Sequence, residues 1–223
     1  MTLEHATELC YLASVTSENP YLDEWRRIYG PDASFYGGFG LNRTRQRIWD
    51  HPNKHLDCFT KRDECVHTYA FSCPTPEAID TIAKHGPVVE IGAGTGYWAK
   101  LLRDRGVDVR AFDLKPPSLQ STKNYWYKNI EPWSRVEYGG APTSNRFPER
   151  SLMLSWPPYG SPMASTALRN YYGDTLIYIG ESYGGCCADN KFFTCVEKEW
   201  TEVANVMLPQ WEGLHDMLWV YQR

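Results

Sequence analysis

The chain has 223 residues, a formal net charge of −4 and a pI near 5.9. This charge offers no general basic surface for a nucleic-acid backbone, so tight binding to duplex nucleic acid is disfavoured, although a local basic patch would still allow it. Hydrophobic residues make up 42% of the chain and charged residues 22%, which is typical of globular proteins and excludes a disordered chain.

The same sequence predicts a soluble protein of the cytoplasm. No apolar run approaches the roughly 18 residues of a membrane span, and the first residues do not resemble a signal peptide. The seven cysteines include no C-x-x-C pair and no zinc-ligand spacing. We therefore expect reduced thiols, no bound metal, no membrane association and a cytoplasmic location.

Residues 1–74 are predicted to form a helical extension. Apolar residues recur at helical spacing from Leu3 to Ala13, and a further helix is predicted from Lys54 to Phe71. Between them, Asn19 and Pro20 have the character of an N-cap and a first helical residue. A short helix is therefore expected there, ending at Gly30-Pro31.

The stretch from Val88 to Tyr97 is the most informative part of the chain. The apolar run of Val88 to Ile91 shows no alternation, as expected for a strand buried on both faces of a parallel sheet. Gly92, Gly94 and Gly96 follow, and glycines let the backbone turn sharply and approach a ligand closely. Because a helix is predicted to start at about Trp98, its N-terminal N–H groups would face the same place.

A strand, a glycine turn and a helix occur together in three kinds of nucleotide site: phosphate-binding P-loops, dinucleotide-binding sites and sites for an adenosyl cofactor. A phosphate-binding P-loop requires Gly-Lys followed by Ser or Thr, which is not present. The dinucleotide fingerprint requires a third small residue at the position that Tyr97 occupies. An adenosyl cofactor therefore becomes the leading hypothesis. The next predicted strand, Val107 to Phe112, is followed directly by Asp113.

Strands and helices continue to alternate, which is the pattern of a doubly wound α/β fold. Besides Val88 to Ile91, the predicted strands are Asp108 to Phe112, Arg135 to Tyr138, Leu152 to Ser155, Thr175 to Ile179, Val203 to Met207 and Met217 to Tyr221. The last two are joined by a connection too short for a helical crossover, so they should pair antiparallel. We expect a seven-stranded, mostly parallel sheet with a reversed last strand, plus the N-terminal helical extension.

The strand ending at Ser155 runs into Trp156, Pro157, Pro158 and Tyr159. In open α/β sheets ligands bind at the carboxyl edge of the strands, where this segment should lie. The two prolines remove N–H donors, so their carbonyls are expected to be free to face a substrate. Tyr159 could stack on a planar group. Glu181, at the end of the next strand, could bind a substrate amine or accept a proton.

The pattern Glu90-x-Gly92-x-Gly94-x-Gly96 resembles motif I of the class I methyltransferases that use S-adenosylmethionine, and the resemblance covers about residues 75–223. It implies S-adenosylmethionine as cofactor, with Asp113 accepting hydrogen bonds from both ribose hydroxyls. It also implies that Glu90 binds the methionine end. The expected cofactor-binding residues are Glu90, Gly92, Ala93, Gly94, Thr95, Gly96, Tyr97, Asp113 and Leu114.

The segment after Leu154 is similar to motif IV of the amino-group methyltransferases, in which Asp, Asn or Ser precedes Pro-Pro and an aromatic residue. Here Trp156 stands directly before the prolines, and Ser155 lies one residue further back. In an extended chain this shift turns a side chain to the opposite face. Either Trp156 forms an aromatic wall of the pocket, or a local bend restores Ser155, and a cationic or aromatic substrate is then as compatible as an amino group. The expected catalytic residues are Ser155, Trp156, Pro157, Pro158 and Tyr159.

The resemblance implies a methyltransferase that methylates a nitrogen of a small planar or amine-containing molecule. Two alternatives remain open: a nucleobase methyltransferase of the adenine N6 type acting on RNA or DNA, and a partner subunit that binds the cofactor without catalysis. In this family N-terminal additions commonly cover the cofactor and complete the substrate pocket. We therefore expect residues 1–74 to form a lid and residues 75–223 the cofactor-binding domain.

Overall fold

The computed structural model describes residues 18–31, 33, 52–117, 127 and 130–223, and for residues 52–57 the backbone alone. The helix expected from Leu3 to Ala13 lies outside these residues. Within the described ranges, no helix is both long and apolar enough to cross a membrane.

Seven strands form one sheet in the order β3-β2-β1-β4-β5-β7-β6. Strands β1 to β5 pair in parallel, and β7 pairs antiparallel with both β5 and β6. This topology confirms the predicted mostly parallel sheet with a reversed last strand. The strands are β1 (Val88–Ile91), β2 (Val109–Asp113), β3 (Glu137–Tyr138), β4 (Ser151–Ser155), β5 (Thr175–Gly180), β6 (Thr201–Met207) and β7 (Met217–Gln222).

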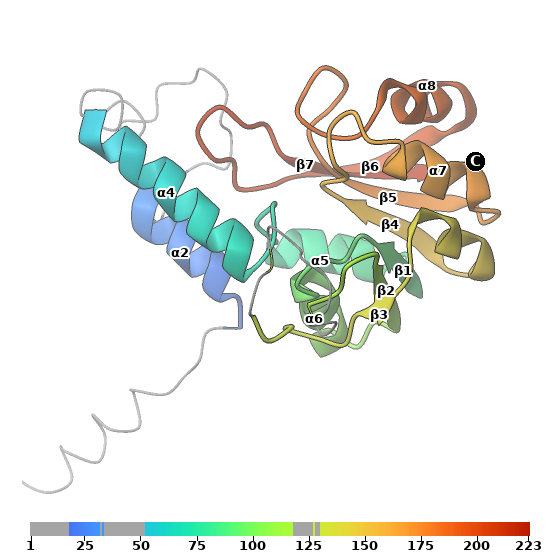
Figure 1. The fold of residues 1–223 in the computed structure, drawn as a ribbon, viewed down its shortest axis with the longest axis horizontal. Coiled ribbons are helices and arrows are strands. Elements are labelled where there is room, and N and C mark those ends of the chain that lie inside the picture. Colours follow the sequence, from blue (N-terminus) through green and yellow to red (C-terminus); the bar gives the residue numbers. More distant parts are fainter. Residues whose placement is uncertain (1–17, 32, 34–51, 118–126, 128–129) are drawn as a thin grey trace, which may run out of the picture.

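The helices expected after Asn19, from Lys54 and from about Trp98 all occur near those positions (Figure 1). The Asn19 side chain accepts a hydrogen bond from the backbone N–H of Leu22, and Thr75 caps its helix in the same way. The helices are α2 (Pro20–Tyr29), α4 (Pro52–Thr68), α5 (Pro76–Ala83), α6 (Tyr97–Asp104), the 3₁₀ helix η1 (Ala141–Arg146), α7 (Met163–Asn170) and α8 (Asn190–Glu199).

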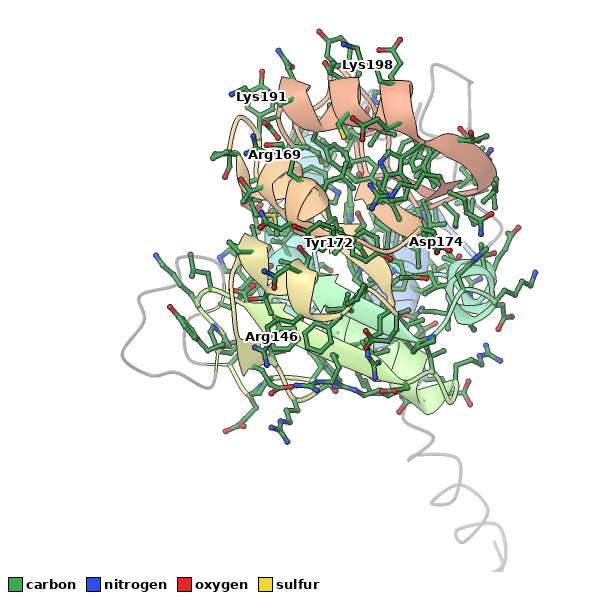
Figure 2. All side chains as sticks on the ribbon, turned by 90° about the vertical axis from the view of Figure 1, so that its right-hand side faces the viewer. Arg146, Arg169, Tyr172, Asp174, Lys191 and Lys198 are labelled. Atoms are coloured by element: carbon green, nitrogen blue, oxygen red, sulfur yellow. The ribbon has the colours of Figure 1, made fainter. Side chains whose placement is uncertain are left out.

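The sheet has a hydrophobic core on each face. Neighbouring residues of β1 point to opposite faces: Val88 packs in the core beneath α5 and α6, whereas Val89 packs in the core beneath α7 and α8. Every residue of β1 and β5 is buried, which explains why their sequences are largely apolar and do not alternate with polar residues. Figure 2 looks onto the side of α7 and α8, where Arg169, Lys191 and Lys198 are exposed.

Helices α2 and α4 lie side by side at one end of the molecule (Figure 1). The α2 side chains Tyr21 and Trp25 are fully buried and belong to the same core as α5 and α6. The indole of Trp25 donates to the carbonyl of Gln210 at 3.3 Å, and that of Trp211 donates to the Tyr21 hydroxyl at 3.0 Å. The described part of the extension therefore packs on the connection between β6 and β7.

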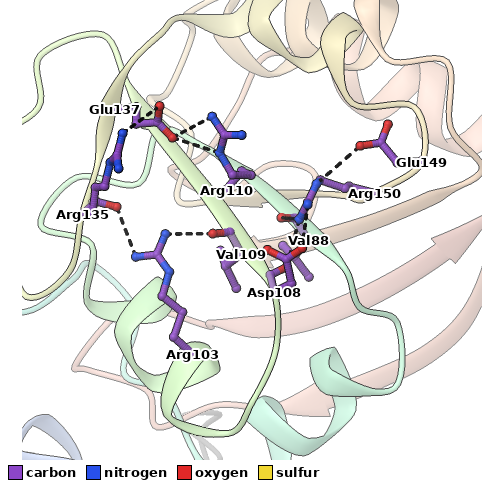
Figure 3. A network of polar contacts seen from close by, with 9 residues as sticks. All are labelled: Val88, Arg103, Asp108, Val109, Arg110, Arg135, Glu137, Glu149 and Arg150. Carbon is purple, nitrogen blue, oxygen red and sulfur yellow. Dashed lines mark hydrogen bonds and ion pairs between the residues drawn. The ribbon is translucent and has the colours of Figure 1, made fainter.

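The amino ends of the central strands are joined by Arg150 (Figure 3). Its guanidinium donates to the Asp108 carboxylate at 2.6 Å and to the backbone carbonyls of Asp108 and Val88 at 3.2 and 3.5 Å. This ion pair lowers the pKa of Asp108. Because these residues stand at the starts of β1, β2 and β4, the carboxyl ends of the same strands form the opposite edge of the sheet.

Candidate active site

A cavity of about 830 Å³ opens at the carboxyl ends of β1, β2 and β4. Its size lies toward the upper part of the range of about 300 to 1,000 Å³ that is typical of ligand sites. Ile91, Asp113 and Ser155, the last residues of these three strands, all line it. The cavity therefore lies at the sheet edge where ligands of open α/β folds bind.

Gly92, the first glycine of the turn after β1, lines the cavity. Gly92, Gly94 and Gly96 all have positive φ values, of 82°, 54° and 76°, which side-chain-bearing residues rarely adopt. The Gly92 N–H donates to the carbonyl of Phe112 in β2 at 2.8 Å. A Cβ atom at Gly94 would lie 2.7 Å from the hydroxyl oxygen of Tyr127. The turn therefore requires glycine both for its backbone conformation and for the close approach of Tyr127.

Asp113, at the end of β2, faces the glycine turn. Its Oδ2 accepts a hydrogen bond from the Gly94 N–H at 2.9 Å, and its Oδ1 accepts one from the Lys115 N–H at 2.7 Å. Each carboxylate oxygen can still accept a further hydrogen bond. Asp113 and its exposed neighbour Leu114 both line the cavity, as expected of cofactor-binding residues.

Glu90 is buried behind the turn, with 1% of its surface exposed. Its Oε2 has no hydrogen-bond partner among the described residues. Burial raises the pKa of this carboxyl to about 8; Arg103 partly opposes this effect, and Asp113 adds to it. A buried carboxyl with one unsatisfied oxygen is unfavourable unless a ligand or another group engages it.

Tyr127 and a glycine-rich segment complete this end of the cavity. Burial raises the pKa of the Tyr127 hydroxyl, and the carboxylates of Asp113 and Glu90 raise it further. Gly139, Gly140 and Ala141, which follow β3, line the cavity as well. Neither this segment nor Tyr127 was among the expected cofactor-binding residues.

Two of the expected cofactor-binding side chains instead contact the N-terminal extension. The Thr95 hydroxyl donates to the carbonyl of Tyr69. The Tyr97 hydroxyl donates to Asn19 Oδ1 at 2.9 Å and accepts from the Tyr21 N–H at 3.3 Å. Neither residue lines the cavity, and neither do Ala93, Gly94 and Gly96, which belong to the buried backbone of the turn. The helix start is thus bound to the extension.

At the end of β4 the chain bends so that both Ser155 and Trp156 line the cavity. Trp156 has a φ of 48°, which is strained for a bulky residue and is found mostly at functional sites. Its indole N–H donates to Asp216 Oδ1 at 3.0 Å, and its ring stacks on Phe71 at 5.3 Å between centroids. The two arrangements that the sequence left open, an aromatic wall and a local bend, therefore occur together.

The proline carbonyls are not free, contrary to the prediction. The Pro157 carbonyl accepts from the Ala188 N–H at 2.8 Å, and the Pro158 carbonyl accepts from the Ser161 N–H at 3.2 Å. The missing N–H donors allow this segment to pair with the loop after β5 through its carbonyls. Tyr159 is 74% exposed and borders the cavity. Pro157 and Pro158 thus line the cavity, while the Pro157 carbonyl binds the loop after β5 and the Pro158 carbonyl closes a turn within its own loop.

Glu181 is also bound within the protein and does not face the cavity. It is 4% exposed, with Oε1 accepting from the His215 N–H at 2.9 Å and Oε2 from the Cys186 N–H at 2.7 Å. Its carboxylate therefore fastens the loop after β5 to the β6–β7 connection, and the idea that it binds a substrate amine is not supported. Among the residues that the structure describes, no group of three or more His, Cys, Asp and Glu could hold a metal ion.

Several lining residues come from segments that the sequence could not associate with the site. Arg62 belongs to α4, Phe71 follows it, Cys186 lies in the loop after β5, and Leu214 lies between β6 and β7. The predicted helix over Lys54 to Phe71 contained the first two residues, but nothing in the sequence indicated which of its side chains face the cavity.

A scan against models of protein families finds no match, and a search of curated protein sequences finds none either. Among solved structures, the chain is similar to 1,6-didemethyltoxoflavin-N1-methyltransferase of Burkholderia thailandensis with bound S-adenosylhomocysteine. The two share 15% sequence identity, the match covers 95% of this chain and 92% of that chain, and the TM-score is 0.42. It is also similar to magnesium protoporphyrin IX methyltransferase of Synechocystis with bound S-adenosylmethionine. Here the sequence identity is 12%, the match covers 95% of this chain and 99% of that chain, and the TM-score is 0.38.

Proposed function

We propose that this chain is a class I methyltransferase that uses S-adenosylmethionine and methylates a nitrogen of a small planar or amine-containing molecule. One observation carries the proposal: Gly92 of the glycine turn, Asp113 and the end of β4 border the same cavity. The cavity therefore has one end suited to an adenosyl cofactor and another end suited to a methyl acceptor.

The cofactor end offers groups that suit the ribose, the adenine and the methionine part of S-adenosylmethionine. The Asp113 carboxylate would accept hydrogen bonds from the ribose hydroxyls, and Leu114 with the segment around Gly140 would border the adenine. The glycine turn would allow the cofactor to approach the backbone. The unsatisfied oxygen of Glu90 supports a role for this carboxyl at the methionine end.

The acceptor end would act chiefly by positioning. When bound, S-adenosylmethionine supplies an electrophilic methyl group on a sulfonium. The acceptor nitrogen would form the new C–N bond as the C–S bond breaks, its proton passing to water and the electron pair remaining on sulfur. Ser155, Trp156 and Tyr159 would hold the nitrogen in line with the C–S bond, and such positioning accounts for much of the rate in reactions of this kind.

We further propose that residues 1–74 are an extension that completes the acceptor end and residues 75–223 are the cofactor-binding domain. In support, Arg62 and Phe71 line the cavity. The bond from Tyr97 to Asn19 connects the extension to the helix that follows the glycine turn. The two parts would thus bind the acceptor together.

The proposal is tested by incubating the protein with S-adenosylmethionine labelled on its methyl group and with fractionated cell extract. We expect label in a small-molecule fraction and none with the Asp113→Ala variant. Label in RNA or DNA would favour the nucleobase alternative. Label in no fraction, together with cofactor binding that Asp113→Ala abolishes, would favour a subunit that does not catalyse. Label transfer that Asp113→Ala leaves unchanged would contradict the proposed site.

A further inference from the structure

Arg62 brings a positive charge to the acceptor end of the cavity. Its side chain is 16% exposed, and its Nε is buried without a hydrogen-bond partner in the described residues. The nearest carboxylate in an ion pair with it is that of Asp63, at 3.9 Å from Nη1, and this carboxylate is 64% exposed. A pair at this distance, with one member open to water, leaves the guanidinium charge largely available.

The other described residues at this end of the cavity do not neutralise that charge. Phe71, Trp156, Tyr159 and Leu214 are uncharged, and Asp113 is at the opposite, cofactor end beside the glycine turn. Arg62 is therefore the charged side chain that the described lining presents to an acceptor.

A carboxyl group does lie behind the Trp156 indole, but it offers an incomplete counter-charge. Asp216 is fully buried and accepts the indole N–H. Burial raises the pKa of this carboxyl to about 7, although Ser72, Trp156 and Arg62 partly oppose the rise. At neutral pH a substantial share of Asp216 is therefore protonated. The second buried acid nearby, Glu181, is bound by two backbone N–H groups.

The aromatic walls indicate the shape of the ligand. Trp156 and Phe71 are stacked with an angle of 18° between their rings, and Tyr159 is exposed at the border of the cavity. Flat aromatic surfaces of this kind favour a flat ring. The Arg62 guanidinium already lies 5.4 Å from the Trp156 ring centroid, so a cationic ligand against the same ring would be repelled. This arrangement disfavours the cationic acceptor that the sequence left open.

We propose that the acceptor end, bounded by Arg62, Phe71, Trp156 and Tyr159, binds a flat aromatic molecule that carries a carboxylate, with the guanidinium of Arg62 binding that carboxylate. Identifying this molecule as the methyl acceptor rests on the proposed function; the binding of the aromatic carboxylate does not. Arginine suits this role because its planar guanidinium can donate two parallel hydrogen bonds to a carboxylate.

Three probes with the same flat ring and different charges test the proposal. Naphthalene-2-carboxylate, naphthalene-2-carboxamide and naphthalen-2-ylmethylammonium are titrated calorimetrically into the full chain with excess S-adenosylhomocysteine present. We expect the carboxylate to bind about tenfold or more tightly than the amide, and the ammonium to bind most weakly. Arg62→Met, which keeps an unbranched apolar side chain, should abolish the difference between carboxylate and amide, and Arg62→Lys should retain part of it.

Lys61→Met is the matched control, because Lys61 is the neighbouring cation on α4 and forms an exposed ion pair with Glu64. It should leave the preference unchanged. Equal binding of carboxylate and amide, tighter binding of the ammonium, no binding of any probe, or a preference that survives Arg62→Met would each overturn the proposal. A separate titration with S-adenosylhomocysteine alone distinguishes the two proposals. If S-adenosylhomocysteine does not bind, while the preference for carboxylate over amide still depends on Arg62, the methyltransferase proposal fails and the carboxylate site stands.

Discussion

Trp156 combines a strained backbone with three distinct side-chain contacts. Its φ of 48° accompanies a hydrogen bond to buried Asp216, a stacked contact with Phe71 and the nearby guanidinium of Arg62. A bulky residue keeps such a φ only where its surroundings determine it strongly. The contacts come from the extension and from the β6–β7 connection, so this one side chain joins both to the end of β4.

Trp156→Phe should destabilise the protein by about 1 to 3 kcal/mol, because a buried carboxyl loses a hydrogen-bond donor. Trp133→Phe is the matched control, since the Trp133 indole donates to the carbonyl of Thr68 at an exposed position, where water can replace it. Urea unfolding of both variants at pH 7 measures the difference. Equal losses of unfolding free energy would show that the bond to Asp216 contributes nothing particular.

Glu90 should make stability depend on pH. Its pKa is about 8 in the folded chain and about 4.5 when unfolded, so between these values the folded state binds more protons than the unfolded state. The free energy of unfolding should therefore fall as pH rises through this window, by about 1 kcal/mol per pH unit from this group. Below the unfolded pKa, the carboxyl is protonated in both states and the effect vanishes.

Glu90→Gln should remove this contribution, so the variant should gain stability relative to wild type between pH 5 and pH 8. Comparing the two proteins at each pH cancels the similar contribution of Asp216, which both contain. Urea unfolding at the two pH values measures the effect. Glu197→Gln is the control, because Glu197 is an exposed residue of α8. If the difference in unfolding free energy between Glu90→Gln and wild type is the same at both pH values, Glu90 is not buried as a neutral acid.

At the scale of elements, α2 is joined to the glycine turn by one side chain. Asn19 accepts hydrogen bonds from the Leu22 N–H and the Tyr97 hydroxyl, and it donates to the carbonyl of Pro74 at 2.9 Å. It therefore caps α2 and also holds the first residue of α6. The sequence predicted the cap, because Asn before Pro is a local signal. The two longer-range bonds have no local signal.

Asn19→Ala should lower the free energy of unfolding by about 2 kcal/mol, since it removes a cap together with two tertiary hydrogen bonds. Thr75→Ala removes only a cap bond, from the Ala78 N–H at 3.1 Å, and should cost about 1 kcal/mol. Chemical unfolding of the two variants side by side compares these losses. A larger loss for Thr75→Ala would contradict the described role of Asn19.

The sequence predicted elements well where one local signal determines them. All seven strands occur near their predicted positions, because the central ones are buried on both faces and the last two are joined by a short connection. The third strand is shorter than predicted, since only Glu137 and Tyr138 pair with β2. Gly92 and Asp113 line the cavity as expected, because their positions follow from the ends of β1 and β2.

The sequence carried no signal where tertiary contacts decide which way a group points. Thr95 and Tyr97 contact the extension, and the carbonyls of Pro157 and Pro158 bond to neighbouring backbone. Arg62 could not be assigned from sequence, because its place in the cavity depends on how α4 packs beside α2. The cytoplasmic location stays a prediction.

For the whole molecule, the topology brings the residues that the proposed reaction would use to one edge of the sheet. Arg150 joins the amino ends of the central strands, while the glycine turn, Asp113 and Trp156 gather at their carboxyl ends. The extension and the β6–β7 connection then border the cavity from the acceptor side through Arg62 and Leu214. Cofactor and acceptor would thus be held by different parts of one fold.

Calorimetric titration with S-adenosylhomocysteine tests the cofactor assignment most directly. We predict that wild type binds one equivalent and that Asp113→Asn lowers the affinity about tenfold or more, because a charged acceptor of hydrogen bonds is lost. Asp108→Asn is the control, since Asp108 pairs with Arg150 at the opposite edge of the sheet, and it should bind like wild type. No binding by wild type, or equal binding by Asp113→Asn and wild type, would contradict the assignment of this cavity as an S-adenosylmethionine site.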